Sequence, residues 1–591
     1  MSKIERFNPA AFLDPLRGKE FSGEWPTIPE MFLITEKRFG SRPCFTDFEG
    51  VGGSRHTLSY TEVKERVLRL SSWLASKGVG SGDKVAVTGK NSPEWATVYL
   101  ATLFVGATIC PIDWALHIEE QENLLATAKP KLFFVDDEKY PHYSEKHHGG
   151  ENDFDVYQLF PSGQSERYVY NLHSETEVSY TLPAENDLAA ILFTSGTTSR
   201  PKGVMLSHKN LVSDAYIAQT NLTILPEDVF YVLLPIHHAY TMQASFIVPL
   251  SVGSEIVYGK SLAVSRLLKE LKEGKITIML GVPMLFNKLA AGIQKGIKSK
   301  GPVVSALMSV LMFISYIIKK LFGVNLGKKI FKAVLLQANL YTIRIAISGG
   351  GPLAKSVFKF FNQIGIDFVQ GYGLTETSPI VALNPKEHFK IESVGSYFKG
   401  YMDMRIDSPD ANGVGEICIK GPMVMQGYYG MPEETAKVMT GDGYFRTGDL
   451  GYLDSENYLM LAGRAKNMIV TEGGKNVYPE EIEDMFQLET DIQQIVVQGY
   501  ISDKEKRTEG IEALVYPSDE LFKRFGLTRD DATIKSSAAD DVQAAVNRVI
   551  HGIVEKVNRQ LLPYQRIDRV VVLREPLEIT TTMKIKRNYN K

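Results

Sequence analysis

The sequence predicts an α/β protein with a large N-terminal domain of stacked α/β sheets and a small α+β domain at its C-terminal end. Amphipathic helix patterns alternate with short apolar runs over residues 57–137, which is typical of the βαβ units of a parallel sheet. Further apolar runs, separated by helical patterns over residues 188–385, predict a second α/β portion. The chain becomes more charged after Gly463, so we expect domains over residues 1–463 and 464–591.

The elements of the first half can be assigned in chain order. The segment YTEVKERVLRLSSWLASKG has the period of an amphipathic helix, and KVAVTG and KLFFVDD are apolar enough for buried strands. Residues 141–185 are polar and without a period, so we expect a surface connection there. Strands are expected next at LAAILFT, VFYVLLP, SEIVYG, ITIMLG and IRIAISG.

The second half of the chain shows two further patterns. The segment VGEICIKGPMVMQGYYG is dense in glycine and β-forming residues, which predicts a short antiparallel sheet or a barrel-like portion. The segments IVVQGY, IEALVYP and VVVLRE predict strands, and residues 541–562 have the pattern of an amphipathic helix. Together these strands and this helix are enough for a small α+β domain.

Length, composition and charge restrict the class of protein. The 591 residues exceed one ordinary core, and 44% hydrophobic with 23% charged residues is the composition of a soluble globular protein. A formal net charge of -3 gives no global field that favours nucleic acid, so no nucleic-acid partner is expected. The cysteines Cys44, Cys110 and Cys418 lack metal-ligand spacing and are expected to be reduced core thiols. The first residues lack an apolar signal region, so we expect a cytoplasmic protein.

Residues 194–203, TSGTTSRPKG, carry the clearest chemical signal. Small hydroxyl residues and glycine let the backbone approach a polyphosphate and offer N–H and O–H donors, while Lys202 adds a positive charge. A Walker A loop is excluded because glycine follows the lysine and a strand is expected next; a flexible hairpin turn is the alternative. The segment therefore predicts a phosphate-binding loop made by Thr194, Ser195, Gly196, Thr197, Thr198 and Lys202.

This loop and six other motifs, which occur in the same order, resemble those of the adenylate-forming (ANL) superfamily of AMP-binding enzymes. The six motifs are LPIHHAY, SGGGPL, QGYGLTET, YFRTGDLG, GRAKNMIVTEGGKNVYPEEIE and TTTMKIKR. The resemblance covers nearly the whole chain and is strongest to bacterial long-chain fatty acid-CoA ligases. It implies that the protein uses ATP and Mg²⁺ to convert a fatty acid into acyl-AMP and pyrophosphate, and then transfers the acyl group to coenzyme A.

The resemblance also implies roles for the nucleotide-binding residues. Glu376, together with Thr194, would hold Mg²⁺, because a hard carboxylate near phosphate oxygens suits that ion. Asp449, in a turn after Thr-Gly, would accept hydrogen bonds from the ribose hydroxyls, although such a residue is otherwise often a turn cap. Glycines would leave room for a flat adenine on which Tyr372 could stack. The other implied nucleotide contacts are Gly349, Gly350, Gly351, Gln370, Gly371, Gly373, Leu374, Thr375, Arg464 and Lys466.

No general base is expected, because a carboxylate is already an anionic nucleophile at neutral pH. Lys202, Mg²⁺ on Glu376 and the donors of the loop would stabilise charge on the departing pyrophosphate. The resemblance adds Lys584 as a second catalytic cation, with Met583 in place of the more common glycine.

For the second half-reaction, the resemblance implies that the small domain rotates about a hinge at Lys466. The adjacent glycines Gly473 and Gly474 would let the pantetheine arm of coenzyme A pass close to the backbone. The acyl site is implied to include His237, His238, Tyr240 and Met242, although a histidine at a strand end is usually a packed or capping residue.

The region over residues 301–332 bears on the acid and on location. Its apolar run, residues 303–318, has lysines on both sides, which is how a monotopic protein sits in an anionic lipid interface; a buried core helix is the alternative. We therefore expect a long-chain acid and peripheral contact with the inner face of a membrane. The flanking lysines are Lys295, Lys298, Lys300, Lys319, Lys320, Lys328, Lys329 and Lys332.

Other functions fit parts of the same pattern. One is a fatty acyl-AMP ligase that delivers its product to a carrier protein, and another is a medium-chain or aryl acid-CoA ligase. A catalytically silent, membrane-associated lipid-binding protein is the alternative outside the enzymes. The joint presence of Lys202, Glu376, Asp449 and Lys584 argues against it, because a protein without catalysis has no physical need of all four.

Overall fold

The computed structural model describes residues 8–49, 54–149, 153–160, 165–175, 178–194, 201–261, 263–471, 475–503, 508–526, 537–579, 585 and 587. The chain forms two compact units. Unit 1 consists of Met1–Gly350, Phe358–Met404 and Ile419–Phe445, and unit 2 of Gly351–Val357, Arg405–Cys418 and Arg446–Lys591. The domain boundary that we expect at residue 463 stays a prediction.

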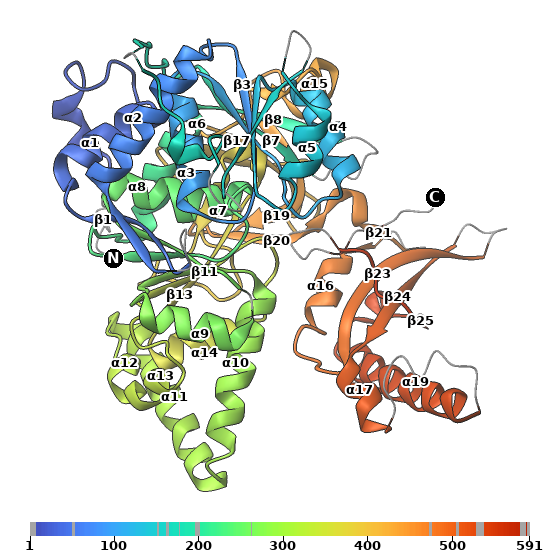
Figure 1. The fold of residues 1–591 in the computed structure, drawn as a ribbon. Helices are drawn as coiled ribbons and strands as arrows, with labels where there is room; N and C mark the ends of the chain where they lie inside the picture. Colours follow the sequence, from blue (N-terminus) through green and yellow to red (C-terminus); the bar gives the residue numbers. More distant parts are fainter. Residues whose placement is uncertain are drawn as a thin grey trace. The chain divides into compact units, whose positions relative to one another are not determined.

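Unit 1 contains a nine-stranded sheet in the order β15-β14-β13-β12-β11-β9-β10-β1-β2 (Figure 1). The strands from β13 to β1 are paired in parallel, and antiparallel strands close both edges. The bounds are β1 (Pro43–Asp47), β2 (His56–Ser59), β9 (Val229–Val232), β10 (Glu255–Tyr258), β11 (Ile278–Gly281), β12 (Ile345–Ser348), β13 (Asp367–Gly373), β14 (Ile380–Leu383) and β15 (Ser396–Tyr397).

A second sheet of unit 1 has seven strands in the order β18-β8-β7-β4-β3-β5-β6. From β3 the chain continues to β4 on one side and then to β5 on the other, so right-handed crossovers put α3 (Pro93–Phe104) and α4 (Ile118–Ala128) on opposite faces (Figure 1). The strands are β3 (Lys84–Thr88), β4 (Thr108–Pro111), β5 (Leu132–Val135), β6 (Asp155–Gln158), β7 (Leu188–Thr194), β8 (Lys202–Ser207) and β18 (Gly427–Tyr428).

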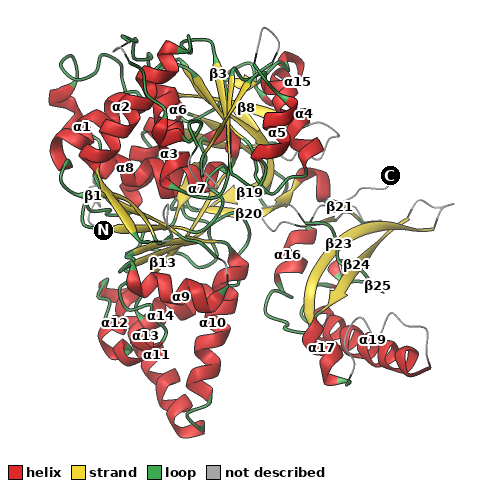
Figure 2. Ribbon diagram, in the orientation of Figure 1, coloured by secondary structure: helices red, strands yellow, loops and turns green. Residues whose placement is uncertain are grey.

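Helices lie against the faces of both sheets of unit 1 (Figure 2). The first two begin at capping boxes, in which Thr27 pairs with Glu30 and Ser59 with Glu62, so local sequence fixes their starts. These two helices are α1 (Ile28–Phe39) and α2 (Tyr60–Ser76). The further helices are α5 (Tyr140–Lys146), α6 (His208–Ile217), α7 (Ala239–Met242), α8 (Val248–Val252), α9 (Val264–Glu273), α10 (Pro283–Lys298), α11 (Pro302–Phe322), α12 (Gly327–Ile330), α13 (Lys332–Gln337), α14 (Lys355–Ile364) and α15 (Pro432–Val438).

Unit 2 has its own core. Apolar side chains of α16 (Pro479–Asp484) and α19 (Ser537–Asn558) cover a three-stranded sheet, and the cluster includes Ile482, Val515 and Ile550. The strands are β23 (Ile492–Asp503), β24 (Thr508–Pro517) and β25 (Arg569–Val572), with α17 (Asp519–Arg524) beside them. The remaining strands are β16 (Asp403–Asp407), β17 (Gly415–Lys420), β19 (Phe445–Leu453) and β20 (Leu459–Arg464) in a four-stranded sheet, and the pair β21 (Ile469–Val470) and β22 (Asn476–Val477).

The structure confirms the predicted α/β class and corrects two local predictions. The five apolar runs in residues 188–385 are strands β7, β9, β10, β11 and β12, and the three cysteines are buried and free. Residues 141–185 are more than a surface connection, because they contain most of α5 and the edge strand β6, which pairs with β5. The glycine-rich segment is divided, since β17 belongs to the four-stranded sheet while β18 joins the seven-stranded one.

Candidate active site

The hairpin of β7 and β8 carries both ends of the predicted phosphate loop. Thr194 and Lys202 form the last residue pair of this antiparallel ladder, and the Thr194 hydroxyl donates to the Lys202 carbonyl at 3.4 Å. A strand follows the lysine, as predicted, so the motif differs from a Walker A loop, which continues into a helix. The intervening residues Ser195, Gly196, Thr197 and Thr198 lie outside the described residues.

The side chain of Lys202 contacts Glu434 and Tyr428, two residues that the sequence did not identify as part of the site. Its Nζ lies 2.7 Å from Oε2 of Glu434, in the first turn of α15, and 4.7 Å from the ring centroid of Tyr428. Hydrogen bonds from Lys202 and then Lys437 lower the pKa of Glu434 to about 2. Glu434 is therefore an anion at neutral pH and balances the charge of Lys202.

Tyr428 is fixed by the short strand β18. It pairs with Val204 of β8, and its backbone N–H donates to the hydroxyl of Thr435 at 2.9 Å. Gly427 has a φ of 131°, and a Cβ there would lie 2.8 Å from the side chain of Thr435, so this close approach requires glycine. The strand thus brings an aromatic face against the cation of Lys202.

Tyr428 also connects Lys202 with the predicted metal ligand. Its hydroxyl donates to Oε1 of Glu376 at 2.9 Å, and the Glu376 carbonyl accepts from the N–H of Met425 at 2.9 Å. Burial and the neighbouring Glu376 carboxylate raise the pKa of Tyr428, which keeps the phenol a neutral donor. The structure therefore joins Lys202, Tyr428 and Glu376 in one contiguous polar cluster. Glu434 adds to this cluster through its contact with the Lys202 ammonium.

Two glycine-rich motifs meet at the carboxyl ends of neighbouring parallel strands. Ser348, at the end of β12, pairs with Gln370 of β13 in register, and β13 then continues to Gly373 in pairing with β14. A Cβ at Gly349 would lie 2.8 Å from the ring of Tyr240, and one at Gly373 would lie 1.6 Å from the carbonyl oxygen of Pro379. In the structure these two glycines are required by protein contacts.

The predicted acyl-site residues follow β9. The ring centroids of His237 and His238 are 4.1 Å apart, and Nε2 of His237 lies 3.3 Å from Oδ1 of Asp113. Tyr240 donates to the Ile347 carbonyl at 3.1 Å, and Met242 is fully buried. Asp113 was missed from the sequence; its position two residues after β4, at the carboxyl end of a parallel strand, is the signal that could have identified it.

Unit 2 contains the other described nucleotide-site candidates. Asp449 is buried inside strand β19 and not in a turn as expected, and it pairs with Arg464 of β20, whose Nε lies 2.9 Å from Oδ1. Burial and then the charge of Arg464 lower the pKa of Lys466. Gly351 also belongs to this unit, whereas Gly473, Gly474 and Lys584 lie outside the described residues. Near the C-terminus, Arg587 donates to both carboxylate oxygens of Glu483 at 2.6 Å.

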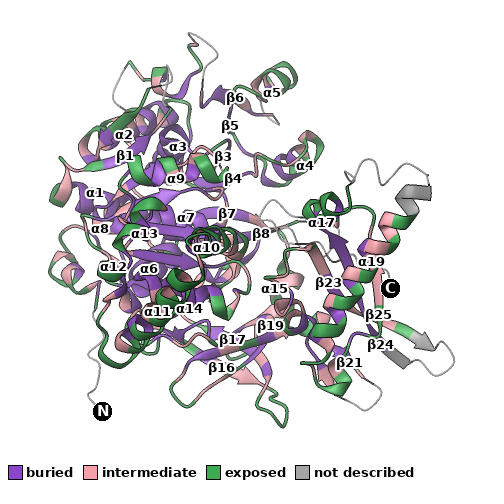
Figure 3. Ribbon diagram, turned by 90° about the horizontal axis from the view of Figure 1, so that it is seen from below, coloured by how far each residue is buried: buried purple, intermediate pink, exposed green. Residues whose placement is uncertain are grey.

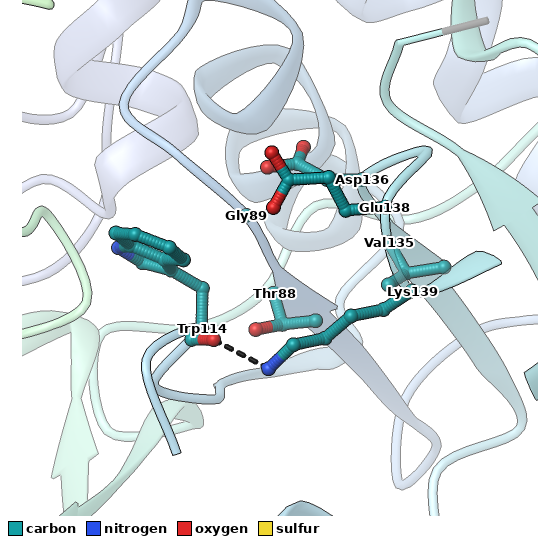
Figure 4. Close-up of a pocket in the computed structure, with 7 residues that line it drawn as sticks. All are labelled: Thr88, Gly89, Trp114, Val135, Asp136, Glu138 and Lys139. Carbon is teal, nitrogen blue, oxygen red and sulfur yellow. Dashed lines mark hydrogen bonds between the residues drawn. The ribbon is translucent and has the colours of Figure 1, made fainter. Parts of the chain in front are cut away.

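A separate pocket at the carboxyl ends of β3 and β5 contains none of the predicted residues (Figure 4). Asp136 and Lys139 line it, and the Lys139 ammonium donates to the carbonyl of Trp114. Burial raises the pKa of Asp136 to about 6, and its Oδ2 accepts from the N–H of Lys90 at 2.7 Å. This pocket is a buried acidic feature distinct from the Lys202 cluster.

Comparison with known proteins adds a family and several relatives. The family of AMP-binding enzymes matches residues 34–429. The long-chain-fatty-acid–CoA ligase heimdall of Drosophila melanogaster is 28% identical over 78% of this chain and 73% of its own. The chloroplastic long-chain-fatty-acid–acyl-carrier-protein ligase AEE15 of Arabidopsis thaliana is 26% identical over 96% of this chain and 85% of its own.

Solved structures extend the likeness to the fold. ATP-bound MatB from Rhodopseudomonas palustris superimposes with a TM-score of 0.71 at 25% sequence identity, and the match covers 95% of this chain and 97% of the other. The fold of this chain is therefore shared over nearly its whole length with a protein whose structure contains ATP.

Proposed function

The chain belongs to the family of AMP-binding enzymes, and from this premise we propose that it is an acyl-CoA ligase whose acid is a long-chain fatty acid. The reaction would proceed in two steps. The fatty carboxylate attacks the α-phosphorus of ATP and releases pyrophosphate, and the thiol of coenzyme A then attacks the acyl carbonyl and releases AMP.

The observation that carries the adenylation step is the cluster of Lys202, Tyr428 and Glu376, and the likeness to ligases named for long-chain fatty acids supports the choice of acid. A cation and a carboxylate are linked through one phenol, with 2.9 Å between Tyr428 and Glu376 and 4.7 Å between the Lys202 Nζ and the ring. A lipid-binding protein without catalysis has no need of this arrangement. A ligase needs it, because negative charge moves onto the departing pyrophosphate and must be neutralised there.

The residues of the cluster would have different roles in the adenylation step. Lys202 would exchange Glu434 for the polyphosphate of ATP, so that its charge remains balanced in both states. Tyr428 holds the Glu376 carboxylate in one orientation by donating to Oε1. We further propose that Lys584 supplies a second cation in the adenylation step, and that Asp449 binds the ribose.

The donor set fits Mg²⁺. Glu376 is a hard oxygen ligand already oriented by a neighbouring hydroxyl, and the hydroxyl of Thr194 is a second oxygen donor of the kind that this ion accepts. When bound, the ion would neutralise charge on the phosphates. The orientation of Glu376 by Tyr428 is the contribution of this chain to that site.

The acceptor is the main point on which the relatives differ. One is named for coenzyme A and the other for acyl carrier protein. We favour coenzyme A because heimdall is named for it, whereas the glycine pair Gly473 and Gly474 would accept the pantetheine arm of either acceptor. Delivery to a carrier protein is the second candidate, and the likeness to AEE15 over 96% of the chain supports it.

Both parts of the proposal can be tested with purified protein. Pyrophosphate release is measured over saturated acids of 6 to 20 carbons and over aryl acids, with coenzyme A, with acyl carrier protein, and with neither. We expect the highest kcat/KM with acids of about 14 to 18 carbons, since each buried methylene contributes roughly 0.8 kcal/mol. Highest activity with an aryl acid, or turnover only with carrier protein, would replace this proposal by one of its alternatives.

A further inference from the structure

Helices α10 and α11 form a hairpin that extends from the nine-stranded sheet of unit 1 (Figure 1). Helix α11 is 21 residues long and very apolar, yet only 17% of its most apolar 18-residue window is buried. By length and composition alone it could cross a membrane. Figure 3 shows much of α11 in the colours of exposed and intermediate residues. The alternative of a buried core helix, left open by the sequence, is therefore wrong.

Most exposed apolar side chains of α11 lie on one face, and Val304, Phe313 and Phe322 are exposed on its flanks. Six of the exposed apolar side chains recur three or four residues apart, which places them on one stripe of an α-helix. Val303 is 80% exposed, Leu307 58% and Leu321 69%. We call this set the apolar stripe, and its members are Val303, Leu307, Val310, Ile314, Ile317 and Leu321.

Polar groups of the same helix face the protein. Ser315 and Lys319 are buried, and the Lys319 ammonium donates to Oδ1 of Asp367 at 2.6 Å and to Oδ1 of Asn362 at 2.7 Å. A helix on the surface of a soluble protein has the opposite arrangement, with polar groups outward and apolar groups inward. Helix α11 is thus fixed to unit 1 by a polar anchor and presents its apolar side outward.

The hairpin itself carries charge of one sign, and the acids near α11, Asp367, Glu387 and Glu392, belong to other elements and interact with Lys319 and Tyr316. No aspartate or glutamate occurs in the sequence between Glu273 and Asp367, although roughly one residue in nine of the whole chain is acidic. Exposed lysines surround the apolar stripe instead. They are Lys288, Lys295, Lys298 and Lys300 on α10 and the connection, and Lys320, Lys329 and Lys332 at the other end of α11 and beyond.

From these observations we propose that the hairpin inserts the apolar stripe into the interface of a membrane rich in anionic lipid. The stripe supplies apolar area for the acyl region, and the lysines at its ends lie where phosphate headgroups would be. A second copy of this chain is a poorer occupant, because two such surfaces would bring lysines together with no acid of the hairpin to pair them. Contact is with one side of α11 only, since Lys319 fixes the other side to the protein through Asn362 and Asp367.

This inference does not depend on which acid the enzyme uses. If the acid is a long-chain fatty acid, the same contact would place the enzyme at the lipid bilayer, in which that acid dissolves. Membrane binding is measured without turnover, so a negative result here leaves the proposed reaction untouched, and failure of the reaction leaves the membrane contact untouched.

Flotation of the full chain with vesicles tests the proposal. Vesicles of phosphatidylcholine with 40% phosphatidylglycerol are compared with vesicles of phosphatidylcholine alone. We expect binding to the anionic vesicles that weakens in 0.5 M salt, and at least tenfold weaker partitioning for Leu307→Ser/Val310→Ser. For Lys298→Gln/Lys300→Gln we expect about a fivefold loss for each lysine removed.

Matched controls separate a local effect from a general one. Leu225→Ser changes an exposed leucine elsewhere in unit 1, and Lys19→Gln/Lys523→Gln removes two exposed lysines outside the hairpin. Both should bind vesicles as the wild type does. Binding that is absent in the wild type, or equal for the Leu307→Ser/Val310→Ser variant at unchanged thermal stability, overturns the proposal. So does a wild-type dimer, seen by sedimentation velocity without lipid, that this variant dissociates.

Discussion

The ammonium of Lys202 lies 2.7 Å from the carboxylate of Glu434, so the cation predicted to bind phosphate is already paired within the protein. The pair is partly exposed, with Glu434 one third accessible, so solvent weakens the attraction between the two charges. A polyphosphate with several negative charges can displace this partner. We therefore propose that Glu434 is a resting counterion that ATP replaces when it binds.

Glu434→Gln should lower the KM for MgATP by about two- to fivefold with little change in kcat, because the polyphosphate no longer competes with a carboxylate. Steady-state pyrophosphate release with a saturating acid measures both constants. Glu433→Gln, which changes the neighbouring acid of α15, is the matched control. A higher KM in Glu434→Gln would mean that the glutamate positions Lys202 for ATP and does not compete with it.

Tyr428→Phe should raise the Mg²⁺ concentration needed for half-maximal rate roughly tenfold, because partners that orient a metal ligand contribute about that much to affinity. The phenol donates to Glu376 at 2.9 Å, and phenylalanine keeps the ring beside Lys202 while removing that bond. Tyr429→Phe is the control. An unchanged Mg²⁺ requirement together with lower thermal stability would give Tyr428 a structural role only.

Lys584→Ala should abolish formation of acyl-adenylate while thioester formation from synthetic acyl-adenylate stays largely intact. The reason is that the proposed role of this cation belongs to the adenylation step alone. The two half-reactions are assayed separately, and Lys586→Ala serves as the neighbouring control. Equal loss in both half-reactions would contradict this division of roles.

Stability should depend on pH through Asp136. An aspartate in the unfolded chain titrates near pH 4, whereas burial raises the pKa of Asp136 in the folded protein to about 6. Between these values the folded state holds a proton that the unfolded state has lost, so the free energy of unfolding falls as pH rises through this window. Asp136→Asn removes the titrating group and retains an acceptor for the N–H of Lys90.

The Asp136→Asn protein should melt a few degrees above the wild type at pH 7.5, and the difference should shrink at pH 4.5. The expected gain in unfolding free energy at the higher pH is on the order of 2 kcal/mol. Scanning calorimetry at both pH values measures the change, and Asp137→Asn, at an exposed neighbour, is the control. A Tm difference that does not vary with pH would show that Asp136 is ionised in the folded protein.

Apolar runs in the sequence predicted the central strands β7 and β9 to β12 of unit 1, because a buried parallel strand needs a continuous apolar run such as LAAILFT. The two-residue strand β18 is too short to have a period, so the positions of Tyr428 and Glu434 could not be predicted. Glu434 lies in the first turn of α15, where an acid is common for helix stability alone.

Turn signals misled the prediction for Asp449. The sequence Thr-Gly-Asp is typical of a turn, but here Gly448 adopts a φ of 70° within strand β19, so the chain continues as a strand. Residues 141–185 gave no strand signal because their edge strand β6, DVYQ, has polar residues at both ends and lacks the continuous apolar run of the central strands. For α11 the sequence predicted the apolar helix with cationic ends, and only the structure could decide which side of it is buried.

The most direct test of the central claim is detection of the acyl-adenylate itself. Wild-type protein is incubated with radiolabelled ATP, Mg²⁺ and palmitate without coenzyme A, and the products are followed by chromatography before and after coenzyme A is added. We predict that palmitoyl-AMP forms and that coenzyme A converts it to palmitoyl-CoA. In Lys202→Ala the rate of palmitoyl-AMP formation should fall by roughly 10²- to 10³-fold. Formation of palmitoyl-AMP at the same rate in Lys202→Ala, or of no adenylate from any acid by folded wild type, would contradict this prediction.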